Sequence, residues 1–135
     1  MKVLLAFIFA SYSLASLAAQ SIVRCDLHRQ GFDEYSYVTY FQPSGANTAL
    51  QIVKGSGIYS YYKLPAPKVE VTNGDFISHV YGMDGNVSLK TSDKVLTDPA
   101  GTHFGGVAES EGGDEAIICY LLKPQQVRRF KDFLR

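Results

Sequence analysis

The chain has 135 residues, with 13 Lys and Arg against 13 Asp and Glu, three His and two Cys. This length supports one hydrophobic core and is too short for two. The formal net charge of zero hides an uneven division between an acidic body and a basic tail, and an acidic body argues against a surface built mainly to grip phosphates.

The first 19 residues have the pattern of a secretory signal peptide. Lys2 is the positive n-region, residues 3–10 are an apolar h-region, and residues 16–18 fit the small-x-small cleavage rule. The apolar run is shorter than the roughly 20 residues that a membrane span needs, so a membrane anchor is the weaker alternative. We expect cleavage after Ala18 or Ala19, secretion, and a mature chain of residues 20–135.

The two cysteines lie near the two ends of the mature chain, at Cys25 and Cys119. In an oxidising compartment an even pair predicts one disulfide, with two unrelated thiols as the alternative. Closing a loop of this length stabilises the folded state by about 4–5 kcal/mol in the chain-entropy model. The bridge is expected to pin the first strand to the last.

Runs of aromatic and β-branched residues, separated by turn residues, predict an antiparallel sheet. Asn73-Gly74 is a strong hairpin signal, and Asp84-Gly85 turns the chain again. Gly105-Gly106, inside one run, predicts a bulge or a close backbone approach. The expected strands are residues 22–27, 35–41, 69–71, 76–83, 87–89, 94–97, 104–109 and 116–122, and residues 59–64 are a tyrosine-rich run.

Two segments are predicted to be helical. In residues 46–54, Leu50 and Val53 are three apart and Gly55 supplies a stop. In residues 123–135, Pro124 suits a first helical position. There the apolar residues Val127, Phe130 and Leu134 form one stripe. The second helix is expected to dock on the body or on a partner, and its basic residues are candidates for binding RNA or that partner: Lys123, Arg128, Arg129, Lys131 and Arg135.

These elements predict an α+β fold. One short helix packs on an antiparallel sheet in residues 20–122, and a C-terminal basic amphipathic helix follows in residues 123–135.

Few residues offer chemistry. The histidines are His28, His79 and His103, at spacings that match no metal motif, so neither a metal nor a cofactor is expected. His79 and Glu70 fall on neighbouring expected strands and are the acid–base candidates for an active enzyme, although a structural role for His79 is the simpler interpretation. The tyrosines are candidates for base stacking, with core filling as the simpler alternative. Asn86 begins an N-glycosylation sequon.

The C-terminal half resembles the small fungal guanyl-specific ribonucleases. The resemblance rests on residues 93–96, a turn, Gly106-Val107, a second turn, and residues 117–119 ending in Cys119. As a pattern it extends over most of the mature chain and is most similar to the secreted ribonuclease-like effectors of haustorium-forming plant-pathogenic fungi such as powdery mildews. It implies a microbial ribonuclease-like fold.

The catalytic residues of that family do not carry over. Lys94 stands where the family has arginine, and it lacks the bidentate fork that matches a phosphate. Ser110 stands in place of the catalytic histidine, and Ala116 in place of an aromatic residue. Residues 59–63 hold no histidine and residues 76–83 no glutamate. The carboxylates around Ser110 would repel a phosphate: Glu109, Glu111, Asp114 and Glu115.

The resemblance therefore implies a catalytically inactive, secreted effector, and no enzyme. It is expected to act as a monomer away from membranes, to bind host plant proteins and suppress plant defence. Host RNA, a plant immune receptor and translocation into the host cell are further possibilities. One alternative is an active secreted ribonuclease or other hydrolase using His79, Glu70 and Lys94. Another is a small secreted protein-binding or inhibitor module, which predicts an exposed patch with aromatic hot spots.

Overall fold

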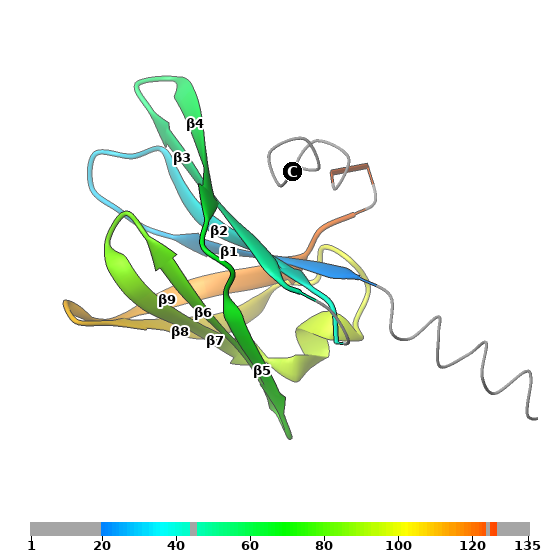
Figure 1. Cartoon of the computed structure of the whole chain (residues 1–135). Coiled ribbons are helices and arrows are strands. Elements are labelled where there is room, and N and C mark those ends of the chain that lie inside the picture. The colour runs from blue at the N-terminus through cyan, green and yellow to red at the C-terminus, as the bar shows by residue number, and fades with distance from the viewer. Residues whose placement is uncertain (1–19, 44–45, 124, 127–135) are drawn as a thin grey trace, which may run out of the picture.

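The structure, a computed structural model, is one curled antiparallel sheet of nine strands (Figure 1). It describes residues 20–43, 46–123 and 125–126. One short 3-10 helix, η1 (Asp93–Leu96), lies between two of the strands. The strands are β1 (Ser21–Leu27), β2 (Glu34–Phe41), β3 (Thr48–Gly55), β4 (Ile58–Leu64), β5 (Lys68–Thr72), β6 (Asp75–Gly82), β7 (Gly85–Ser92), β8 (Phe104–Ser110) and β9 (Gly113–Leu121).

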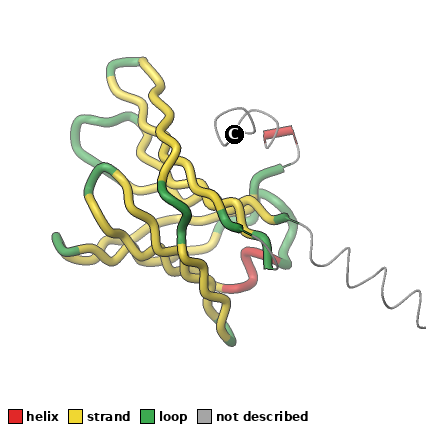
Figure 2. Tube along the Cα trace, in the orientation of Figure 1, coloured by secondary structure: helices red, strands yellow, loops and turns green. Residues whose placement is uncertain are grey.

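The strand order is β4-β3-β2-β1-β9-β8-β7-β6-β5, and every neighbouring pair is antiparallel. Two meanders, β1 to β4 and β5 to β9, therefore meet at the β1–β9 ladder. β4 and β5 follow each other in the chain yet occupy opposite edges of the sheet. Between them lie Pro65 and Pro67, which have no N–H to donate and so break the sheet ladder. The tube in Figure 2 shows this loop between two long runs of strand.

The sheet curls until its two meanders face each other across a core. The hydroxyls of Thr39 on β2 and Ser78 on β6 are 2.9 Å apart and buried. The rings of Phe41 and Phe76 meet edge to face with centroids 5.8 Å apart. We call the side of the sheet that lines this core the inner face and the opposite side the outer face. Successive side chains of a strand alternate between them.

The turns follow the chemistry of their residues. Gly74 (φ 99°) and Gly85 (φ 86°) adopt the left-handed conformation that glycine tolerates best, so the hairpins predicted at Asn73-Gly74 and Asp84-Gly85 are confirmed. A polar network closes one end of the curl. Tyr35 donates to Asp84 at 2.8 Å, and Arg29 binds both Asp84, at 3.1 Å, and Glu115.

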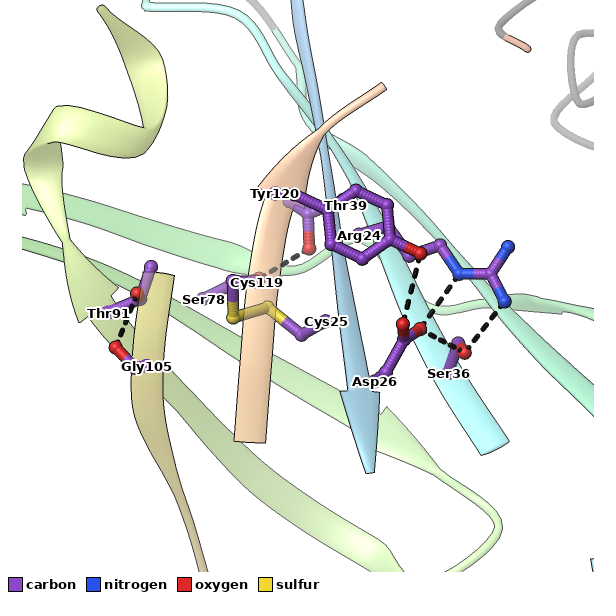
Figure 3. Close-up of a disulfide and its surroundings, with 10 residues drawn as sticks. All are labelled: Arg24, Cys25, Asp26, Ser36, Thr39, Ser78, Thr91, Gly105, Cys119 and Tyr120. Carbon is purple, nitrogen blue, oxygen red and sulfur yellow. Dashed lines mark hydrogen bonds and ion pairs between the residues drawn. A yellow bond between two sulfur atoms is a disulfide. The ribbon is translucent and has the colours of Figure 1, made fainter. Parts of the chain in front are cut away.

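Cys25 and Cys119 form a disulfide, as predicted (Figure 3). They are directly paired in the β1–β9 ladder, with Cα atoms 4.1 Å apart. Both are buried in the inner core. The bridge therefore lies on the seam that joins the two meanders and pins the first strand to the last.

The predicted α+β class is wrong, because the described residues form an almost entirely β structure. The helix predicted for residues 46–54 is not formed. Strand β3, residues 48–55, takes its place. Its β-branched Thr48, Ile52 and Val53 suit a strand, and β3 pairs with β2 and β4 on both sides. Residues 94–97, expected to be a strand, overlap η1, which Ser92 caps by accepting from the Lys94 N–H.

Two predictions fall largely outside the described residues: the signal peptide of residues 1–19 and the C-terminal helix of residues 123–135, of which Lys123, Gln125 and Gln126 are described. Within the described ranges, no helix has the length and apolar character to cross a membrane.

Candidate functional site

The structure brings His79 and Glu70 together on the outer face. The β5–β6 register pairs His79 with Lys68, so Glu70 is its diagonal neighbour. His79 Nε2 is 2.8 Å from Glu70 Oε2. The Lys68 ammonium is 3.7 Å from the other carboxylate oxygen. The pKa of Glu70 is lowered, first by its hydrogen bond to His79 and then by the charge of Lys68.

Ser88 extends this pair into a chain of three side chains. It lies opposite His79 in the β6–β7 ladder, and its Oγ is 2.8 Å from His79 Nδ1. An ionised carboxylate can only accept, so Nε2 carries the proton that it donates to Glu70. In the neutral ring Nδ1 then accepts from Ser88. The arrangement can draw a proton from the Ser88 hydroxyl, the geometry that an activated serine nucleophile requires.

This chain borders an open hollow of about 630 Å³ over β6, β7 and the end of β8. Its charged lining residues are Lys68, His79, Glu109 and Glu111. Two carboxylates against one lysine repel an anion, so the hollow suits a neutral or cationic ligand better than a phosphate.

The other predicted site residues lie elsewhere. Lys94 is exposed on η1, and no hydrogen bond or ion pair joins it to His79 or Glu70 among the described residues. Lys123 is exposed, while Arg128, Arg129, Lys131 and Arg135 lie outside the described residues. Asn86 is exposed at the start of β7. Where the structure describes the chain, no three His, Cys, Asp or Glu side chains gather to hold a metal ion.

The four carboxylates near Ser110 lie at or beside the β8–β9 turn. Glu109, Glu111 and Asp114 are exposed, whereas Glu115 is paired with Arg29. Ser110 donates to the Gly113 carbonyl oxygen at 3.1 Å.

The edge strand β4 is a second candidate site. Ile58, Tyr59 and Tyr62 leave 69%, 44% and 43% of their surface exposed. By the β3–β4 register, Tyr59 and Tyr61 lie on the outer face, while Ile58 and Tyr62 lie on the inner face. The Tyr59 and Tyr61 rings stack with centroids 6.0 Å apart, and the Lys54 ammonium lies 5.0 Å from the Tyr59 centroid. Aromatic side chains thus project on both sides of an edge of the sheet.

The contact between Ser88 and His79 was not predicted from the sequence. The signal was available in the Asp84-Gly85 turn, because counting outward from Gly82 opposite Gly85 places His79 opposite Ser88. The position of the tyrosine-rich run at an edge of the sheet was not predicted either, because it depends on the order of all nine strands.

No protein-family model, curated protein or solved structure matches this chain.

Proposed function

We propose that this chain is a secreted binding protein without catalytic turnover, which engages a partner protein along the exposed edge of β4. The signal-peptide pattern of residues 1–19 supports secretion. The resemblance to fungal effectors supplies the expected class of partner, host plant proteins, and suppression of plant defence as the expected result. The fold itself gives no support to a ribonuclease scaffold.

The contrast between the two sheet edges carries this proposal. β5 is five residues long and presents Lys68 and Glu70, as a protected edge does, with Val71 as its one exposed large apolar residue. β4 is seven residues long and has three exposed large apolar or aromatic side chains among its first five residues, with the exposed Lys63 near its end. A long edge with this many exposed apolar and aromatic side chains favours pairing with another chain.

The residue types at β4 suit protein recognition. In β-strand addition, main-chain hydrogen bonds give affinity and the alternating side chains give specificity. Tyrosine offers a large contact area at low entropic cost, and tyrosines are frequent among binding hot spots. Residues 55–62, Gly-Ser-Gly-Ile-Tyr-Ser-Tyr-Tyr, combine tyrosine with small adaptable residues.

The test is capture of plant proteins by the refolded mature chain, followed by their identification. The double variant Tyr59→Ala/Tyr62→Ala is expected to bind the captured protein at least tenfold more weakly, with a correspondingly higher Kd, because two contact side chains are removed. Tyr81→Ala is the matched control, since Tyr81 is a 57% exposed tyrosine on β6 and away from the edge. Equal retention by the two variants would contradict the proposal.

A hydrolase is the second candidate, favoured by the two 2.8 Å contacts of His79. In this mechanism Ser88 Oγ attacks the carbonyl carbon of a neutral ester, and His79 takes the hydroxyl proton and passes it to the leaving alkoxide. Water then releases the acyl group. The His79 and Glu70 side chains are 39% and 43% exposed, so water competes for both hydrogen bonds. For this reason binding at β4 is ranked first.

A fluorophosphonate probe and p-nitrophenyl acetate test the second candidate. An active Ser88 is expected to take the probe as a mass adduct, and Ser88→Ala and His79→Gln are expected to abolish both adduct and turnover. Ser110→Ala is the control, because Ser110 lines the same hollow without contacting His79. No adduct on the wild-type chain would remove the hydrolase and leave the binding protein.

A further inference from the structure

A group of apolar side chains is buried on the outer face of β1, β2 and β3. Val38 and Leu50 are 0% exposed and Ile52 is 1% exposed. They alternate with inner-face residues such as Tyr37 and Ala49, which belong to the separate inner core. We call this group the outer cluster; its members are Ile22, Val38, Tyr40, Leu50, Ile52 and Leu122.

The other meander leaves its outer face open. Tyr81 on β6 and Val107 on β8 are exposed there, and so is Ile118 on β9. Among the described residues, the apolar side chains packed against the outer cluster are Tyr61 and Tyr120, which are only partly buried themselves. Complete burial of Val38 and Leu50 therefore calls for a cover over the centre of the cluster.

We propose that the cover is the C-terminal segment of this same chain, residues 127–135. The chain enters that segment from the cluster itself. Leu122 is a buried member of the cluster, and its N–H donates to the Ile22 carbonyl oxygen at 2.9 Å. Lys123 then donates its N–H to the Gln126 side-chain oxygen at 2.9 Å, which is the return bond of a capping box at the helical residues 125–126.

The sequence of the segment matches the cluster in pattern and length. In a helix Val127, Phe130 and Leu134 share one stripe, and Arg129 falls on the opposite side. Residues 127–135 as a helix span about 14 Å, which equals about three strand spacings of roughly 4.8 Å. The outer cluster occupies three strands and the residue that follows β9.

The charges also match. A hollow of about 330 Å³ beside the cluster is lined by Asp26, Asp33 and Glu34 together with Arg24 and Tyr120. The segment carries four basic residues against Asp132. The tail is thereby assigned an intramolecular role, in place of a free arm that binds RNA.

Nuclear Overhauser effects on the full mature chain test this assignment. The Phe130 ring protons are expected to show effects to the methyl groups of Leu50 and Ile52. A sample mixed from labelled and unlabelled chains separates contacts within one molecule from contacts between two. Contacts within one molecule support the proposal; contacts only between molecules, or no contacts at all, overturn it.

A matched pair of variants adds a readout of stability. Phe130→Ser is expected to lower the Tm by several degrees and to increase the binding of a hydrophobic dye, because the outer cluster becomes accessible. Arg129→Ser, on the opposite side of the helical pattern, is expected to change neither. Equal behaviour of the two variants would show that the stripe does not face the cluster.

Discussion

At the scale of single residues, Gly106 is the position where the backbone allows no side chain. It lies on β8 between Thr91 on β7 and Ile117 on β9. A Cβ there would overlap the Lys90 carbonyl oxygen and lie 3.2 Å from the Thr91 Cβ. The close backbone approach predicted from Gly105-Gly106 is therefore confirmed, and it belongs to the second glycine.

Gly106→Ala is accordingly expected to lower the free energy of unfolding by about 1–3 kcal/mol, because β7 must move to admit a methyl group. Gly105→Ala is the control, since a Cβ at Gly105 meets nothing within 4 Å. Urea unfolding of both variants measures the difference. Equal stabilities would contradict this account of the β7–β8 contact.

Tyr120 gives a prediction for alkaline pH. Burial raises its pKa to about 12, and its hydroxyl donates to Asp26 at 3.0 Å (Figure 3). An unfolded tyrosine ionises near pH 10, so between about pH 10 and 12 the unfolded state loses a proton that the folded state keeps. The free energy of unfolding therefore falls as pH rises through this window.

Tyr120→Phe removes this contribution, although other buried tyrosines, including Tyr37, share the same direction of shift. The variant is expected to lose stability less steeply than the wild type between about pH 10 and 12. Urea unfolding at several pH values measures the two slopes. Identical slopes would show that the Tyr120 hydroxyl ionises equally well in both states.

At the scale of elements, the sequence indicates strands well where one face is buried and the other is not. β6 alternates buried Phe76, Ser78 and Val80 with less buried residues, and its hairpin was predicted correctly. β3 lacks this alternation, because Leu50 and Ile52 on the outer face are as buried as Ala49 and Val53 on the inner face. A strand buried on both faces loses its period of two and cannot be told from a short buried helix.

The candidate sites were likewise predictable from the sequence only where local features determine them. Glu70 and His79 were expected on neighbouring strands, and the hairpin between those strands sets the register that brings them together. The exposure of β4 was not predictable in this way, since it requires knowing that β1 pairs with β9 and that β4 and β5 stay apart. Long-range strand order carries no local sequence signal beyond the two cysteines.

At the scale of the whole molecule, the β1–β9 seam holds the two meanders together. The backbone joins them through the linker between β4 and β5, and their side chains also meet across the core, as Thr39 and Ser78 do. The disulfide crosses the seam between residues 94 positions apart in sequence. We expect it to limit how far the two meanders separate in the unfolded chain.

The double variant Cys25→Ala/Cys119→Ala is expected to lose about 4–5 kcal/mol of unfolding free energy in the chain-entropy model. Urea unfolding, compared with that of the reduced wild-type chain, measures the loss and separates the bridge from the packing of the two side chains. A loss below about 1 kcal/mol in both would show that the ladder and the core hold the seam without the bridge.

Hydrogen exchange of the mature chain, with and without the protein that it captures, shows whether a partner pairs with β4. Pairing at β4 predicts that the partner slows exchange of backbone amides in residues 58–64 and leaves β6 and β7 unchanged. Protection confined to the hollow beside His79 and Ser88, or no protection in residues 58–64, would contradict it.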